Sequence, residues 1–304
     1  MDKYHTSVFL DEIIDLLKIK KGNRYIDATL GGGGHTFEIL KKGGLVLGID
    51  ADQDAIEYVN KKWQEISNKE NLEPENLTLA RGNFRNLKEI ARLNKFTSPS
   101  GIIYDLGVSS HQIDEEERGF SFLKEGPLDM RMDKENPVKA SDLVNILTKG
   151  ELYDIFSRLG QERRARSISD CIIRARRVKP IQTTEDLAEI VQEAYGIRKG
   201  PISTFAKANI NKRVFQALRI AVNSELENLS QTLPQALETL GKGGKVLVIT
   251  FHSLEDRIVK LTFKDFQERD LGKIITKKPL MPTKGEMESN RRSKSAKLRV
   301  FEKN

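Results

Sequence analysis

The feature that most constrains the fold is the segment 25–50, YIDATLGGGGHTFEILKKGGLVLGID. Its apolar start, Tyr25–Asp27, predicts a short strand, which is followed by four consecutive glycines and a helix-compatible stretch. Leu45–Ile49 is then a continuous apolar run, typical of a strand buried on both faces of a parallel sheet. The segment therefore predicts one βαβ crossover. Its glycines lie at the carboxyl end of the first strand, where open α/β sheets bind ligands.

The glycine loop, residues 31–34, indicates a ligand that approaches the main chain closely, because four glycines in succession cost backbone entropy. It does not fit the dinucleotide pattern G-x-G-x-x-G, since Thr36 stands where the third glycine would be. Asp27 before the loop favours a cationic ligand, and Asp50 lies at about the spacing at which an acid reaches ribose hydroxyls. The pattern favours a nucleoside with a positive group, of which S-adenosylmethionine is the common example. The alternative is a flexible turn, with Asp50 capping the next helix.

Composition indicates an ordinary soluble protein of one or two domains, with 304 residues, 38% of them hydrophobic and 31% charged. No stretch approaches the roughly 20 apolar residues of a membrane span, and the first residues lack a signal-peptide pattern. The single cysteine, Cys171, excludes a disulfide within the chain and favours a cytoplasmic location. Since the four histidines are well spread, no metal site is expected.

Positive charge is concentrated in two places, and the formal net charge is +7. Two separate basic clusters favour a polyanionic partner; the alternative is that they are the solvated faces of ordinary helices. The arginine cluster comprises Arg163, Arg164, Arg166, Arg174, Arg176, Arg177 and Lys179. The C-terminal cluster comprises Lys273, Lys277, Lys278, Lys284, Arg291, Arg292, Lys294, Lys297 and Arg299.

The α/β pattern is interrupted in the middle of the chain. After a polar stretch rich in turn signals, apolar residues recur at helical spacing without a convincing strand, until an apolar run resumes at 245–250. We therefore expect an α/β core formed by residues 1–113 and 213–304, with an inserted helical domain at 114–212. Within these parts we expect a basic loop at 196–210 and a long helix at 214–229.

Local signals predict several further features. Thr183 with Asp186, and Ser253 with Asp256, fit capping boxes at helix starts. The alternation at 296–301 predicts an edge strand of the sheet.

Three residues stand just after predicted strands and are candidates for the site. Asp105 ends the apolar run 102–105 and precedes a glycine-containing loop, as a catalytic edge requires, although it could also cap a turn. Phe84 is either a core residue or a stacking partner for a ligand base. His252 either lines the site or bonds to the backbone.

Taken together, the motifs resemble those of the bacterial small-subunit (16S) ribosomal RNA cytosine-N4 methyltransferases of the MraW/RsmH type. The resemblance runs from about His5 to Val300 and is carried by HTSVFLDE, YIDATLGGGGHT, GNFRNL, DLGVSS, GPLDMRMD, RVFQALRIAVNSEL, FHSLEDRIVK and SNRRSKSAKLRV. GPLDMRMD, FQALRI and FHSLEDR are far more specific than the glycine loop.

This resemblance implies a class I (Rossmann-like) methyltransferase core with an inserted helical domain for substrate recognition. It implies S-adenosylmethionine as methyl donor and a decoding-region cytidine as acceptor. The implied partner is small-subunit ribosomal RNA or the assembled small subunit, in the cytoplasm, with no membrane and no metal.

Carried over by position, the resemblance implies a set of cofactor contacts. They would be the loop residues, an acid for the ribose, an aromatic ring near the adenine and two residues at the reactive end: Gly33, Gly34, His35, Asp50, Phe84, Asp105 and Gln112. One segment departs from the family, which usually has His-Pro-Ala-Thr-Arg where this chain has 209–213, Asn-Ile-Asn-Lys-Arg. Only Arg213 is retained, so any role of this segment in RNA contact is in doubt.

Asp105 is the candidate catalytic residue, as an acceptor for the amine that is methylated, through its carboxylate or the adjacent carbonyl. Many amino-group methyltransferases place Pro-Pro and an aromatic residue directly after this acid, whereas Leu106-Gly107 follows here. A stacking partner for the base is then expected elsewhere, at Phe120 or Phe122. The candidate substrate contacts are Asp129, Arg131, Asp133, Arg213 and His252; the DMRMD segment either holds the nucleotide or ties the insert to the core.

Other functions stay open at this point. A nucleotide-dependent oxidoreductase uses a related sheet, but the dinucleotide fingerprint is missing. A non-enzymatic RNA-binding protein would keep the basic clusters and a vestigial site. A methyltransferase that acts on DNA or on a small molecule is a closer alternative, and the basic insert argues mildly against a small-molecule substrate.

Overall fold

The computed structural model describes residues 7–197 and 203–304. The chain divides into two compact units: a core unit, Met1–Ser109 with Leu226–Asn304, and a helical unit, Ser110–Glu225. This division differs from the expected boundaries at 114 and 212. A boundary at 212 would divide the helix α10 (Thr204–Asn223). The observed boundary follows Glu225, just after Ser224, which ends the helix with φ 50°.

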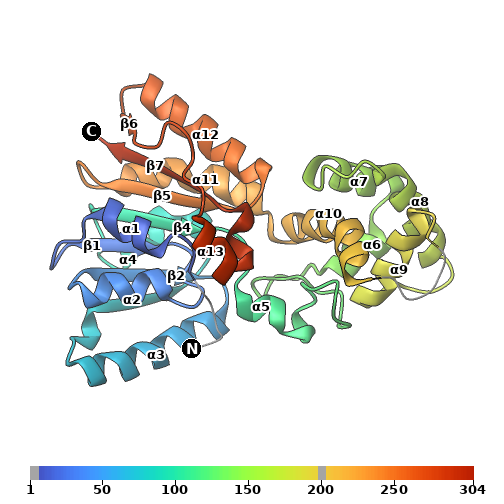
Figure 1. Cartoon of the computed structure of the whole chain (residues 1–304), viewed down its shortest axis with the longest axis horizontal. Coiled ribbons are helices and arrows are strands. Elements are labelled where there is room, and N and C mark those ends of the chain that lie inside the picture. The colour runs from blue at the N-terminus through green and yellow to red at the C-terminus, as the bar shows by residue number, and fades with distance from the viewer. Residues whose placement is uncertain (1–6, 198–202) are drawn as a thin grey trace. The chain divides into compact units, whose positions relative to one another are not determined.

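The core unit contains a seven-stranded sheet of order β3-β2-β1-β4-β5-β7-β6 (Figure 1). Neighbouring strands from β3 to β5 are parallel, so their carboxyl ends lie along one edge. The predicted edge strand is wrong in its position: β7 pairs antiparallel with β5 and β6, and β6 forms the edge. The strands are β1 (Arg24–Asp27), β2 (Leu45–Asp50), β3 (Leu77–Arg81), β4 (Gly101–Asp105), β5 (Lys245–Thr250), β6 (Gly272–Ile274) and β7 (Lys297–Lys303).

Helices cover both faces of this sheet, and each face has its own apolar core. One core includes Ile13, Ile39 and Trp63, and it packs α1 (Leu10–Leu17), α2 (Gly34–Lys41) and α3 (Gln53–Glu70) against the sheet. The other packs α4 (Leu87–Leu93), α11 (Glu225–Thr239) and α12 (Ser253–Glu268) against it. Burial on both faces explains the unbroken apolar strands, and the predicted α/β class is confirmed.

Within its described residues the helical unit contains no strand and is built from helices of 5 to 20 residues. These are α5 (Ser110–Asp114), α6 (Ala140–Ile146), α7 (Lys149–Asp154), α8 (Ala165–Arg176), α9 (Thr184–Ala194) and α10. The predicted capping box of Thr183 and Asp186 is confirmed at the start of α9.

Two sequence predictions around α10 are wrong. The expected basic loop at 196–210 is helical from Thr204, because the Ser203 hydroxyl caps α10; residues 198–202 lie outside the described part. The expected long helix at 214–229 is two helices, since Ser224 adopts a left-handed conformation between α10 and α11.

The last part of the core unit, before β7, contains α13 (Lys284–Ser289) and a 3-10 helix, Arg291–Ser295. In the part of the chain that is described, no helix has the length and hydropathy needed to cross a bilayer.

Candidate cofactor and substrate site

The loop between β1 and α2 is held together by Asp27, which is 1% exposed. Its Oδ2 accepts a hydrogen bond from the Thr36 hydroxyl at 2.8 Å, and its Oδ1 accepts one from the Thr29 N–H at 3.3 Å. Burial raises the pKa of this carboxyl, against the opposing effects of His35, Thr36 and Thr29. Asp27 therefore shapes the loop from inside the protein, and its side chain is not presented to a ligand.

Gly33 and Gly34 are required by the packing of the protein itself. Gly33 has φ 75°, and a Cβ there would lie 2.9 Å from the Phe37 ring and 3.0 Å from Val59 Cγ2. A Cβ at Gly34 would lie 2.0 Å from the Ser7 hydroxyl oxygen. The packing of the protein itself therefore favours glycine at both positions, whatever the loop binds.

The segment Ser7–Phe9, which we call the N-terminal strap, lies against this loop. His35 Nε2 donates a hydrogen bond to the Val8 carbonyl oxygen at 3.0 Å, and the Phe9 N–H donates to Glu286 Oε1 at 2.8 Å. Phe9 is fully buried, although its φ of 57° is unusual for a bulky residue. The side chain of His35 thus holds the strap, so any contact it makes with a cofactor would come from its main chain.

Asp50, at the end of β2, is joined to the glycine loop. Its Oδ2 accepts the Gly31 N–H at 2.8 Å, and its Oδ1 accepts the Asp52 N–H at 2.9 Å. Burial raises the pKa of Asp50 to about 6, and nearby acids add to the rise, while the two hydrogen bonds oppose it. Each oxygen keeps a second lone pair, and the residue is partly exposed, so the carboxylate has acceptors left for hydroxyl groups.

Phe84 follows β3 and combines the two roles considered for it, since it is partly exposed and also packs against the core. Its ring meets Tyr104 edge-on, with centroids 5.8 Å apart. Its carbonyl oxygen accepts the Thr232 hydroxyl at 2.8 Å, and Thr232 in turn lies 2.7 Å from the Tyr104 hydroxyl. These contacts fix the ring at the carboxyl edge of the sheet.

Asp105 ends β4 at the same edge and is partly exposed. Its N–H donates a hydrogen bond to the Thr29 hydroxyl oxygen at 2.6 Å, which ties the end of β4 to the start of the glycine loop. The backbone of the candidate catalytic residue is thus fixed by a residue that the sequence patterns did not single out.

His252 is the N-cap of α12, and its capping partner is Glu255. Glu255 Oε2 accepts the Phe251 and His252 N–H groups at 2.8 and 3.2 Å, and His252 Nε2 lies 3.2 Å from Glu255 Oε1. The predicted box of Ser253 and Asp256 is therefore wrong by one residue. Asp256 instead pairs with Arg299 at 2.7 Å.

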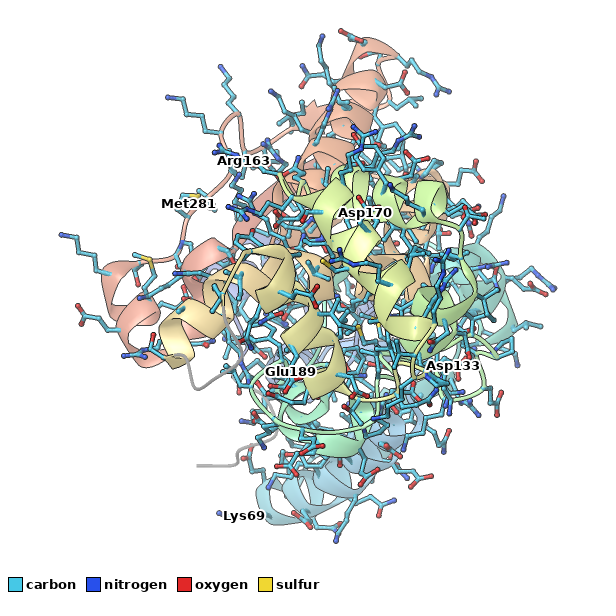
Figure 2. The ribbon with its side chains drawn as sticks, turned by 90° about the vertical axis from the view of Figure 1, so that its right-hand side faces the viewer. Lys69, Asp133, Arg163, Asp170, Glu189 and Met281 are labelled. Atoms are coloured by element: carbon cyan, nitrogen blue, oxygen red, sulfur yellow. The ribbon has the colours of Figure 1, made fainter. Side chains whose placement is uncertain are left out.

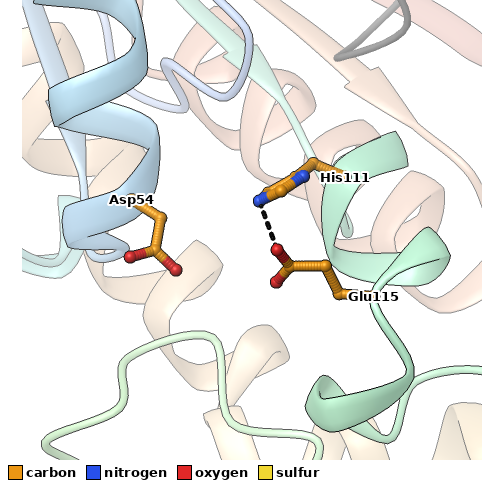
Figure 3. A group of neighbouring side chains, drawn as sticks. All are labelled: Asp54, His111 and Glu115. Carbon is orange, nitrogen blue, oxygen red and sulfur yellow. Dashed lines mark ion pairs between the residues drawn. The ribbon is translucent and has the colours of Figure 1, made fainter.

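Gln112 lies in α5 of the helical unit and is buried. Beside it in sequence, His111 Nε2 forms an ion pair with Glu115 at 2.9 Å (Figure 3). The expected absence of a metal stays a prediction.

Asp129 and Arg131 pair with each other inside the helical unit. Arg131 Nε and Nη2 donate to the two Asp129 oxygens at 2.8 and 2.9 Å, and Arg131 Nη1 donates to the carbonyls of Lys134 and Asn136. Burial alone would raise the pKa of Asp129, but the Arg131 hydrogen bonds hold it below its usual value. This segment therefore folds around an internal ion pair, which favours a structural role for both residues.

Two other candidate substrate contacts in the helical unit also form hydrogen bonds within the protein. Asp133 Oδ1 accepts the Glu135 N–H at 3.0 Å, and Arg213 Nη1 donates to the Gln161 carbonyl at 3.0 Å. Of the two possible stacking residues, Phe120 is buried, whereas Phe122 is partly exposed and packs edge-on against Phe215.

The structure brings a subset of the predicted residues to one edge of the core sheet. Gly33, Gly34, His35, Asp50, Phe84, Asp105 and His252 follow the carboxyl ends of β1 to β5. The residues that sequence reasoning missed are the strap, Thr29 and Glu286. Only the motif HTSVFLDE pointed to the strap, and nothing in the local pattern of Glu286 linked it to residue 9.

A sheet of this order, with a glycine loop after β1 and a partly exposed acid after β2, defines the chain as a class I methyltransferase. The acceptors left on Asp50 fit the ribose of its cofactor, S-adenosylmethionine. The chain matches the model of the MraW methylase family over residues 2–304 and belongs to that family.

Three curated relatives extend along the whole chain, and each is named ribosomal RNA small subunit methyltransferase H. The protein of Carboxydothermus hydrogenoformans is 43% identical, covering 100% of this chain and 99% of its own length. That of Halothermothrix orenii is 45% identical over 98% of both chains. That of Clostridium botulinum is 42% identical over 100% of both.

Proposed function

We propose that this protein transfers a methyl group from S-adenosylmethionine to the N4 amine of a cytidine in the decoding region of small-subunit ribosomal RNA. The main support is the sequence identity of 42–45% to relatives named for methylation of this RNA, over 98–100% of the chain. The choice of the cytosine N4 amine rests on the motif resemblance of the sequence.

The proposed cofactor contacts are those at the carboxyl edge of the core sheet. We assign the ribose hydroxyls to Asp50, the adenine to Phe84, and the remaining contacts to the main chain of Gly33, Gly34 and His35, with Asp105 near the reactive end. Gln112, in the helical unit, is a further candidate that rests on the motif resemblance alone. When bound, S-adenosylmethionine supplies a methyl group activated by its sulfonium.

The chain must supply placement and a proton acceptor, because the lone pair of a cytosine amine is delocalised into the ring. Asp105 is fixed by its backbone bond to Thr29, so its position relative to the glycine loop is set before substrate binds. A carboxylate there accepts a hydrogen bond from the amine and favours loss of its proton as the new N–C bond forms.

The helical unit is proposed to take part in recognition of the RNA. Arg213 of this unit, and His252 at the edge of the core sheet, are further candidates for contacts to the nucleotide. The target cytidine must be unpaired or extruded, since a paired amine is inaccessible. We place the reaction in the cytoplasm, where small subunits are assembled.

The test is methyl transfer to small ribosomal subunits from cells that lack this protein. Purified protein and labelled S-adenosylmethionine should label the RNA, and mass mapping should place one methyl group on one cytidine. Nucleoside chromatography should then match N4-methylcytidine and not 5-methylcytidine. Label on another base, on protein or on DNA alone would overturn the proposal.

A further inference from the structure

The two basic clusters differ in how their charges are used. In the arginine cluster, Arg176 Nη1 donates to the carbonyls of Val144 and Leu147, at 2.9 and 2.6 Å. Arg174 pairs with Glu193 at 2.8 Å. Much of this cluster therefore holds the helical unit together.

Arg164 belongs to the same pattern. Its Nη1 donates to the Ala194 carbonyl at 3.1 Å, and its guanidinium lies 4.6 Å from the centroid of the Tyr195 ring. These contacts close the end of α9 onto the start of α8, and they engage N–H groups of Arg164 that a partner would otherwise contact.

Three members of the C-terminal cluster, all in strands, form ion pairs within the core unit. Lys273 pairs with Glu302 at 2.9 Å, and Lys297 and Arg299 pair with Asp256 at 3.2 and 2.7 Å. The remaining members are exposed and lie between β6 and β7. We call them the C-terminal basic surface: Lys277, Lys278, Lys284, Arg291, Arg292 and Lys294.

This surface stands on an ordered scaffold. The Leu280 N–H donates to the Leu298 carbonyl at 2.9 Å and the Leu298 N–H donates back at 3.0 Å, so the loop is fastened to β7. The Thr283 hydroxyl caps α13, and Ser293 is buried within the 3-10 helix. Met281, labelled in Figure 2, is 55% exposed between these anchors.

The surface lies next to the cofactor loop. Glu286, in the middle of it, accepts the Phe9 N–H, while the preceding strap residue, Val8, accepts the bond from His35 at the start of α2. Of the two acids in 277–294, Glu286 is thus occupied by the strap and only Glu288 is exposed. The positive charge is therefore held beside the edge at which the methyl group is transferred.

We propose that the C-terminal basic surface binds the backbone phosphates of the substrate RNA beside the target cytidine. This inference rests on the proposed function, because it takes ribosomal RNA as the partner. Six exposed cations on a fixed scaffold match the regular negative charge of a phosphate backbone, and such contacts position RNA without reading its sequence.

The experiment compares two triple variants of the full-length protein with equal charge changes. The test variant is Lys278→Gln, Lys284→Gln and Lys294→Gln. The control is Lys42→Gln, Lys69→Gln and Lys242→Gln, three exposed lysines that lie near the amino ends of the core strands. Binding to small subunits from cells that lack the protein is measured over a series of salt concentrations.

We expect the test variant to bind about tenfold more weakly or worse at low salt, and the slope of log K against log salt to fall by about 2. The control variant should behave like the wild type. Calorimetry with S-adenosylhomocysteine should give the same Kd for all three proteins, which shows that the cofactor loop is intact.

A test variant that binds subunits as tightly as the control, with an unchanged slope, would overturn the proposal. So would a larger loss in a third variant, Arg163→Gln, Arg166→Gln and Arg177→Gln, with none in the test variant. Failure of the proposed function looks different, because the wild type itself would then neither methylate nor bind subunits.

Discussion

Asp50 Oδ2 accepts a hydrogen bond of 2.8 Å from the Gly31 backbone N–H, so the acid that ends β2 and the glycine loop after β1 form one unit. Protonation of this carboxyl therefore weakens its hydrogen bond to the loop as well as its ability to accept hydrogen bonds from a ribose.

From this unit we predict that cofactor affinity falls as the pH is lowered through about 6, the value to which burial raises the pKa of Asp50. The protonated acid accepts hydroxyl hydrogen bonds less well than the carboxylate. Titration of S-adenosylhomocysteine by calorimetry between pH 5 and 8 measures this. Asp50→Asn should bind about tenfold more weakly and show a flat profile. An equally flat profile for the wild type would contradict the assignment.

The same pKa has the opposite effect on folding. Because the pKa is raised in the folded state, the contribution of Asp50 to the free energy of unfolding is fully present below the usual pKa of 3.8 and is lost as pH rises through about 6. Urea unfolding of the cofactor-free protein should show this contribution growing as pH falls, while cofactor affinity declines. Asp50→Asn is the control, because this pH-dependent contribution to the free energy of unfolding should be absent from it.

Gly33→Ala should destabilise the protein by about 2–4 kcal/mol, because it combines a left-handed φ with overlap against the Phe37 ring. Chemical denaturation measures the loss. Gly150→Ala is the matched control, since a Cβ there meets nothing within 4 Å and the residue lies in α7. This change should be neutral or should stabilise the protein by a few tenths of a kcal/mol. The gain is expected to be about half or less of the Gly-to-Ala difference in a helix interior, because Gly150 lies in the first turn of α7. Equal effects at the two positions would contradict the packing argument.

Ser7 and Gly34 should be strongly coupled. Gly34→Ala places a methyl group 2.0 Å from Ser7 Oγ and should cost about 1–3 kcal/mol by forcing the strap away. In a Ser7→Ala background the cost should shrink by about 1 kcal/mol or more, because the clashing oxygen is gone. A double-mutant cycle in urea measures the coupling, and strictly additive effects would show that the strap does not press on the loop.

Ser7→Ala alone should leave stability unchanged or raise it by about 1 kcal/mol, because Ser7 Oγ is buried without a hydrogen-bond partner among the described residues. A clear loss of stability would mean that the hydroxyl has a partner in the folded protein.

Asp105→Asn should lower the rate of methyl transfer by about a hundredfold or more, since the amide is a poor proton acceptor. The Kd for S-adenosylhomocysteine should change much less than the rate, because the backbone N–H that binds Thr29 is kept and the amide still offers an oxygen acceptor to the cofactor. Single-turnover transfer of labelled methyl to small subunits separates the two effects. A variant that binds cofactor and methylates at the wild-type rate would remove Asp105 from the chemistry.

The parts of the fold that could be predicted are those that depend on residues close together in the sequence. The run 45–49 is apolar throughout because β2 is covered on both faces. Thr183 and Asp186, three residues apart, mark the start of α9 because each side chain accepts the backbone N–H of the other. The place of β7 between β5 and β6 could not be predicted, since the order of strands depends on contacts far apart in sequence.

The candidate site shows the same limit. Asp50 was recognised from its distance to the glycine loop in sequence, but the use of Asp27 inside the loop depends on Thr36, which only folding brings to it. The bond between Phe9 and Glu286 spans 277 residues and leaves no local signal. The arginine cluster was misleading in part, because composition does not reveal that Arg176 is turned onto main-chain carbonyls.

The position of β7 has a consequence for synthesis. Ribosomes make chains from the amino end, so β7, Lys297–Lys303, emerges after both of the strands between which it inserts. Until it inserts, β5 and β6 have no common neighbour, and Asp256 lacks the two cations it pairs with. A nascent chain that has not yet exposed β7 thus holds an open, incomplete sheet, so the core closes only after this strand has left the ribosome.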